Sequence, residues 1–181
     1  MKSAAKCLAL AATLGLSACL YANSSLIPDD KSLKLFGDSA RFTYLSATSL
    51  RDKPPLTYGG AVSWNGNGYD LTPDESSGQD KTKVKLATLE GTAFLIAEEL
   101  DVHADGSPAK PSYALARRDG STVRVYNSDC EKFGDDERRL LGLTKVEGEG
   151  GCRVDSLAQL GIVLKLLTTK PLDLNMTYTV K

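Results

Sequence analysis

The chain has 181 residues, and its composition, with 41% hydrophobic and 25% charged residues, is typical of a globular protein of one domain and excludes a wholly disordered chain. The formal net charge of −1 excludes the strongly basic surface of a nucleic-acid-binding protein. We therefore expect a core of ordinary size and no nucleic acid partner.

The first 18 residues have the three parts of a secretory signal peptide. Lys2 and Lys6 give it a positive start, residues 7–15 are mostly apolar, and small residues precede a cysteine. The apolar stretch is too short for a transmembrane helix, which needs about 20 apolar residues. We therefore predict that residues 1–18 are removed during export.

The end of this signal, Leu16-Ser17-Ala18-Cys19, resembles the lipobox of bacterial lipoproteins. The resemblance implies that Cys19 carries a thioether-linked diacylglycerol and that the new amino terminus receives a further acyl chain, such as palmitate. Several acyl chains anchor a protein stably, so we expect the mature protein to stay on a membrane. The alternative is an ordinary secretory signal with no lipid on Cys19.

Leu20 follows the lipobox cysteine. In lipoproteins of enteric bacteria an aspartate at this position resembles a signal for retention in the inner membrane. Its absence therefore favours the outer membrane of the bacterial cell envelope, with the domain on the periplasmic face or the cell surface.

The segment after the lipobox is polar and turn-prone, with Asn23-Ser24-Ser25 and Pro28-Asp29-Asp30. Such a composition is typical of a linker. We predict a flexible tether over residues 19–34 and a single globular domain over residues 35–181.

Three segments combine an apolar-alternating run, a turn centred on glycine and a second run, which is the pattern of a β-hairpin. They cover residues 61–71, 84–96 and 113–126, with turns at Asn65-Gly66-Asn67-Gly68, Glu90-Gly91 and Asp119-Gly120. The dipeptides Asn-Gly and Asp-Gly predict type I′ turns, in which both central residues have positive φ.

Two further strands and two helices complete the pattern. Residues 41–45 predict a leading strand and residues 175–180 a closing one. Helices are predicted over 131–141 and, more clearly, over 156–169, where Asp155 or Ser156 can cap the start and Pro171 follows the end. The apolar face of the second helix consists of Leu157, Leu160, Val163, Leu164 and Leu167.

The predicted fold class is α+β: an antiparallel, meandering and curved sheet of six to eight strands, with the C-terminal helix packed on one of its faces. Whether the sheet closes into a barrel stays open at this point.

The four cysteines divide into two pairs. Cys7 leaves with the signal and Cys19 carries the lipid, so Cys130 and Cys152 remain in a compartment that permits disulfides. We predict a disulfide between them, worth about 3 kcal/mol on the chain-entropy model. A metal pair or a redox couple is the alternative, but no CxxC spacing and no nearby histidine support it.

His103 is the single histidine, and the spacing of Asp101, His103 and Asp105 resembles the opening of an EF-hand loop. Ser112 stands where that loop needs a bidentate glutamate, so we predict no metal site. The sequence has no GxSxG nucleophile motif and no phosphate-binding glycine loop.

Glu98 and Glu99 are adjacent in a predicted strand, so their side chains point to opposite faces and cannot act together as acid and base. We therefore predict no catalytic residues, no cofactor and no enzymatic activity. Most aromatic residues of the hairpins should be core, but Trp64 and Tyr69 are candidates for lining a binding groove or a barrel mouth.

Three functions are compatible with these features. The leading hypothesis is a non-catalytic, membrane-anchored envelope lipoprotein whose sheet surface binds a protein or another envelope component. The second is a carrier of a small apolar ligand in a partial β-barrel. The third is a hydrolase with unfamiliar residues. A cavity inside the sheet would favour the second hypothesis.

Overall fold

The computed structural model describes residues 20–46, 57–75, 81–101, 109–146 and 151–181. The predicted signal peptide, Cys19 and His103 lie outside these ranges. Within them, no helix combines the length and the apolar character that crossing a membrane would require.

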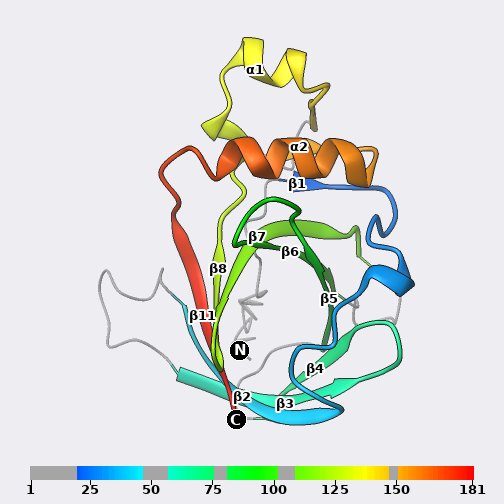
Figure 1. The fold of residues 1–181 in the computed structure, drawn as a ribbon, viewed down its shortest axis with the longest axis vertical. Helices are drawn as coiled ribbons and strands as arrows, with labels where there is room; N and C mark the ends of the chain where they lie inside the picture. Colours follow the sequence, from blue (N-terminus) through cyan, green and yellow to red (C-terminus); the bar gives the residue numbers. More distant parts are fainter. Residues whose placement is uncertain (1–19, 47–56, 76–80, 102–108, 147–150) are drawn as a thin grey trace, which may run out of the picture.

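Eight antiparallel strands form a closed barrel (Figure 1). Each strand from β2 to β8 pairs with the next in the chain, and β11 closes the ring by pairing with both β8 and β2. The strands are β2 (Ser39–Ser46), β3 (Thr57–Trp64), β4 (Tyr69–Pro73), β5 (Thr82–Thr88), β6 (Leu95–Asp101), β7 (Ser112–Asp119), β8 (Thr122–Tyr126) and β11 (Leu174–Val180). The antiparallel meander predicted from the sequence is confirmed, and the sheet is a barrel.

The three predicted hairpins are present as β3–β4, β5–β6 and β7–β8, but their turns differ from the prediction. Positive φ occurs at Gly66, Gly91 and Gly120, and no other residue type has positive φ in the described ranges. The type I′ prediction, which needs positive φ at two successive residues, is therefore wrong. In each turn one glycine alone adopts positive φ.

Three short strands extend the sheet beside β7. Strand β1 (Leu20–Tyr21) pairs antiparallel with β7 and parallel with β10 (Gly151–Arg153), which pairs with β9 (Thr144–Val146). The predicted disulfide is confirmed: it joins Cys152 in β10 to Cys130 in a short 3-10 helix, Cys130–Lys132. Another 3-10 helix spans Asp29–Lys31.

The stronger predicted helix is α2 (Leu157–Leu167), and Ser156 caps it by accepting a hydrogen bond from the backbone N–H of Gln159 at 3.1 Å. The other predicted helix is shorter than expected. Helix α1 spans Asp135–Leu140, and Gly134, the residue before it, has an extended backbone.

The wall formed by β5, β6 and β7 separates two apolar cores. In β7, Ala114 and Ala116 face the barrel interior, whereas Tyr113 and Leu115 face outward, and all four are fully buried. Helix α2 covers the outer face of this wall (Figure 1), with four of its five predicted face residues buried there: Leu160, Val163, Leu164 and Leu167. The predicted packing of the helix on one face of the sheet is thus confirmed.

The segment predicted as a flexible tether lies against the barrel in its described part. Leu20, Ala22 and Ile27 are buried in the outer core. Further along, the backbone N–H of Leu33 donates to the carbonyl of Leu86 at 2.7 Å. Residues 20–34 therefore lie against the wall of the barrel in this structure, which the sequence did not predict.

Candidate functional site

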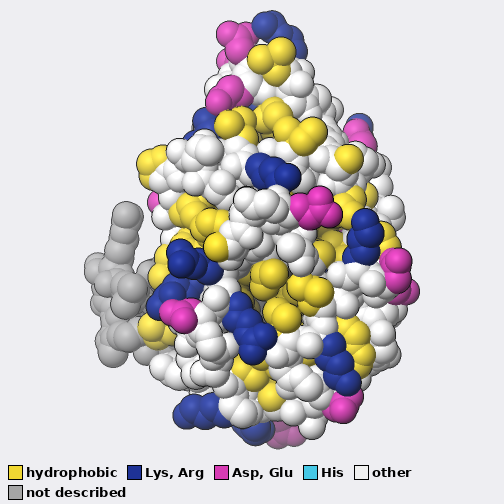
Figure 2. Space-filling view, in the orientation of Figure 1, with side chains coloured by type: hydrophobic (Ala, Val, Ile, Leu, Met, Phe, Trp, Pro, Cys, Tyr) yellow, Lys and Arg dark blue, Asp and Glu magenta, His cyan; other side chains and the backbone are white. Residues whose placement is uncertain are grey.

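The barrel interior holds a cavity of about 80 Å³. Apolar side chains from β2, β3, β4, β5, β6, β8 and β11 line nearly all of it. Figure 2 shows hydrophobic side chains gathered in the hollow that the strands surround, with Lys and Arg side chains around it. The cavity lining is Phe36, Phe42, Val62, Tyr69, Leu71, Val84, Leu86, Ala97, Glu99, Val123, Val125, Tyr178 and Val180.

Glu99 is the one acidic or basic residue in this lining. Its side chain points inward from β6 and is 6% exposed, and its Oε2 atom has no hydrogen-bond partner among the described residues. A buried carboxyl without a partner costs free energy, since transfer from water to an apolar site is unfavourable unless hydrogen bonds replace those to water. Most buried polar side-chain atoms in folded proteins have a hydrogen-bond partner, so the Oε2 atom of Glu99 requires an explanation.

The surroundings of Glu99 favour its neutral form. Burial raises the pKa of Glu99 well above its ordinary value, and the negative charge of Asp101, two residues along the same strand, raises it further. Asp101 itself accepts a hydrogen bond from the hydroxyl of Thr82 at 3.0 Å. Burial also raises the pKa of Tyr178, with Glu99 as the second cause.

Aromatic side chains line the same spaces as Glu99. Glu99, Phe42 and Tyr178 line both the main cavity and a small adjacent void that Tyr44 also borders. The ring centroid of Tyr178 is 5.6 Å from that of Tyr44 and 6.0 Å from that of Phe42. Gly60 lies opposite Phe42 in β3, where a Cβ atom would come within 2.6 Å of the Phe42 ring. A glycine at this position therefore leaves room for that ring inside the barrel.

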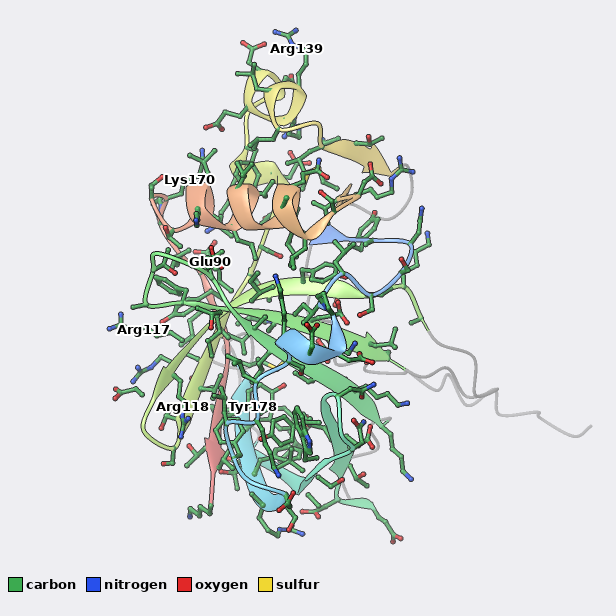
Figure 3. The ribbon with its side chains drawn as sticks, turned by 45° about the vertical axis from the view of Figure 1, so that its right-hand side comes forward. Glu90, Arg117, Arg118, Arg139, Lys170 and Tyr178 are labelled. Carbon is green, nitrogen blue, oxygen red and sulfur yellow. A yellow bond between two sulfur atoms is a disulfide. The ribbon has the colours of Figure 1, made fainter. Side chains whose placement is uncertain are left out.

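Phe36 covers the cavity at the end where the three hairpins lie. Its backbone N–H donates to the hydroxyl of Tyr69 at 2.7 Å, and the guanidinium carbon of Arg118 lies 5.2 Å from its ring centroid. Figure 3 shows Arg117 and Arg118 near the end of the β7–β8 hairpin and Tyr178 in the lower part of the barrel. The segment before β2 thus contributes part of the cavity lining.

Glu98 has the opposite environment. Its carboxylate lies in the outer core and accepts hydrogen bonds from the Ser25 hydroxyl at 2.5 Å, the Leu26 and Ile27 backbone N–H groups at 2.9 and 3.1 Å, and the Tyr113 hydroxyl at 2.9 Å. As predicted for adjacent strand residues, Glu98 and Glu99 point to opposite faces of the wall. Glu98 is a structural residue, whereas the Oε2 atom of Glu99 has no hydrogen-bond partner in the part of the chain that the structure describes.

The two aromatic candidates from the sequence lie next to each other. Tyr69 lines the cavity, whereas Trp64 packs edge-on against Tyr69 at 5.0 Å and does not border the cavity. Within the described ranges, no three Cys, His, Asp or Glu side chains converge as metal ligands.

Sequence reasoning missed Glu99 and Phe36 as site residues. Glu99 lies in a run of alternating faces, Ile96 outward and Ala97 inward, so its inward position could have been deduced. Its burial could not, because burial depends on closure of the barrel. Phe36 falls in a segment without periodicity and carries no signal of its own.

A second hollow of about 580 Å³ lies outside the barrel, between α2 and the β5–β6 hairpin. Charged side chains, among them Lys31, Glu90 and Lys165, share its lining with apolar ones. Its lining is therefore mixed rather than apolar. The interior cavity is the stronger candidate site, because it combines an almost wholly apolar lining with a buried carboxyl whose Oε2 atom has no hydrogen-bond partner among the described residues.

Replacing Glu99 with glutamine is expected to change how stability depends on pH. Because the pKa in the folded state lies above the ordinary value of 4.5, the stabilisation by the bound proton is fully present below about pH 4.5 and is lost as pH rises through the raised pKa. Over that window the wild type should lose about 1.4 kcal/mol of unfolding free energy per pH unit relative to Glu99→Gln. Urea unfolding at a series of pH values measures this difference.

The matched control is Glu90→Gln, which removes the same charge from an exposed loop. It should keep the pH profile of the wild type. Parallel profiles for the wild type and Glu99→Gln would show that the carboxyl is solvated in the folded protein.

No family model, no curated protein and no solved structure matches this chain.

Proposed function

We propose that this protein is a membrane-anchored, non-catalytic binder of a small apolar molecule, which it holds inside the barrel. The observation that carries the proposal is the apolar cavity enclosed by a closed eight-stranded sheet. The mouths and interiors of β-barrels are frequent binding sites for small ligands, because strands fix the lining without filling it. The cavity volume of about 80 Å³ restricts the buried part of the ligand to a few heavy atoms.

The proposed anchor is lipid on Cys19, in the outer membrane of a bacterial envelope. Leu20, the next residue, is fully buried in β1, so the lipid would hold the barrel close to the bilayer surface. A ligand that partitions into membranes would then be concentrated near the barrel. Mass spectrometry of the mature amino terminus tests the anchor, and a terminus without lipid would contradict it.

The hypothesis of an envelope protein partner stays a prediction. Leu140 on α1 and Ile162 on α2 are 85% and 60% exposed, which suits contact with another protein. Single exposed apolar side chains are common on protein surfaces, however, and do not by themselves mark an interface. The apolar cavity inside the barrel is the more specific feature.

Filling the cavity should abolish binding. Ala97 lines the cavity, and Ala97→Leu places three more carbon atoms in that space. With n-butanol as the probe, saturable shifts of the Val62, Leu86 and Val123 methyl signals are expected in NMR spectra of the wild type. The affinity of Ala97→Leu for butanol should be at least about tenfold lower.

The matched control is Ala116→Leu. Ala116 is fully buried in the same interior but does not border the cavity. Leucine there should overpack the core and lower the unfolding free energy by about 1–3 kcal/mol, whereas Ala97→Leu should cost less. Absence of saturable shifts in the wild type, or equal affinities of the wild type and Ala97→Leu, would refute a ligand site in the barrel.

A further inference from the structure

We propose that the ligand carries an organic ammonium group, which binds to the carboxylate of Glu99 with its apolar part in the barrel cavity. This inference rests on the proposed function and adds the chemical class of the ligand.

The first argument is the missing partner of Glu99. Apart from two tyrosines the rest of the cavity lining is apolar, yet Glu99 is buried there without a hydrogen bond to its Oε2 atom from the described residues. A valine or leucine at this position would line the cavity at lower cost. A ligand with N–H donors and a positive charge would supply the absent partner and stabilise the ionised form of Glu99, which releases its proton to solvent as the ligand binds. Hydrogen bonds between charged groups are about twice as strong as neutral ones.

The second argument is the ring of aromatic side chains next to the carboxyl. Tyr178 and Phe42 border the same cavity, and Tyr44 borders the adjoining void together with Glu99. The faces of aromatic rings attract cations, most strongly where water is excluded. One carboxylate with three neighbouring rings favours an ammonium ion over a neutral or an anionic head group.

The third argument is the apolar character of the remaining lining. Val62, Leu86 and Val123 lie on three different strands and surround the space inside the barrel with hydrocarbon. The volume of about 80 Å³ is roughly half that of an engineered void of 150 Å³ that binds benzene. The apolar part of a ligand that fits this volume is therefore a short alkyl chain, and n-butylammonium is a suitable probe.

Basic residues at one end of the barrel favour an anionic ligand over a cationic one, which is the outcome that competes with this proposal. Arg117, Arg118 and Arg124 lie in the β7–β8 hairpin, and Arg118 contacts Phe36 at the cavity end. Positive charge near an opening favours anionic ligands. A carboxylate with the same alkyl chain is thus the appropriate competitor.

The experiment compares n-butylammonium, n-butanol and butyrate as ligands of the full chain in lipid nanodiscs, with empty nanodiscs subtracted. Affinities are measured from the methyl signals that line the cavity. We expect n-butylammonium to bind at least about tenfold more tightly than the other two. Glu99→Gln should abolish this preference while it keeps the affinity for butanol, and Glu90→Gln should leave all three affinities unchanged.

The outcomes separate the two proposals. If all three probes bind the wild type equally, or butyrate binds best, and Ala97→Leu weakens them, the ammonium inference is wrong and the barrel remains the binding site. If Glu99→Gln keeps the preference for n-butylammonium, the inference is likewise wrong. If no probe binds, or Ala97→Leu has no effect on any of them, the proposed function itself fails.

Discussion

Replacing Glu98 with alanine is expected to lower the free energy of unfolding by about 3–5 kcal/mol, because it removes the acceptor for four buried or half-buried donors. Truncation leaves the Ile27 amide without its acceptor, whereas the Leu26 amide keeps a second one, the Tyr113 hydroxyl at 2.9 Å. An unsatisfied buried group costs about 1–3 kcal/mol. These amides belong to the segment that crosses the outer wall of the barrel, so the local order of residues 24–28 should be lost first. Urea unfolding measures the stability, and hydrogen exchange at the two amides measures the local effect.

Glu98→Gln is the conservative control, because it keeps the size and one acceptor oxygen. Its loss of stability should lie between that of Glu98→Ala and zero. The neighbouring Glu99→Gln should not destabilise the protein at neutral pH. A loss below about 1 kcal/mol for Glu98→Ala would mean that the amides of residues 26 and 27 find other partners without difficulty.

Removing the disulfide is the second change with a large expected effect. The double variant Cys130→Ala with Cys152→Ala should lose about 3 kcal/mol of unfolding free energy, because the crosslink closes a loop across a sequence separation of 22 residues and restricts the unfolded chain. Both cysteines are fully buried in the outer core between α2 and the barrel wall. The loss should therefore be larger than the entropy of the loop alone if the vacated space does not close.

The reduced wild type separates these two causes. It lacks the crosslink but keeps both sulfur atoms in the core. Its free energy of unfolding should therefore exceed that of the double variant by the cost of the void that the two alanines leave. Thermal or urea unfolding with and without reductant gives both values. A double variant as stable as the oxidised wild type would show that the crosslink does not restrict the unfolded chain.

Several parts of the fold follow from short stretches of sequence. The hairpins follow from alternating runs that meet at Gly66, Gly91 and Gly120, since a turn needs few residues and its conformation depends on them directly. Helix α2 follows from Ser156 as its cap and from a face of leucines and valine with helical spacing. The Cys130–Cys152 disulfide follows from the count of cysteines if residues 1–18 are taken as the predicted export signal and Cys19 as the predicted lipid site.

The predicted tether shows where such reasoning stops. Polar and turn-forming residues from Asn23 to Asp30 look like a linker, and nothing local distinguishes them from one. Their path is set by Glu98, which lies 72 residues further along the chain than Leu26 and provides the acceptor for its amide. A contact between residues so far apart in the chain produces no periodic pattern in the sequence.

The sequence by itself determined the local elements of this protein, their antiparallel order and the opposite faces of Glu98 and Glu99, because each depends on neighbours within a few residues. Only the tertiary structure decided that β11 pairs with β2 to close the sheet, that both glutamates are buried, and that one has four partners while the other has an apolar cavity before it. The physical reason is that burial and hydrogen bonding are properties of the space between elements. That space exists once strands from both ends of the chain have met.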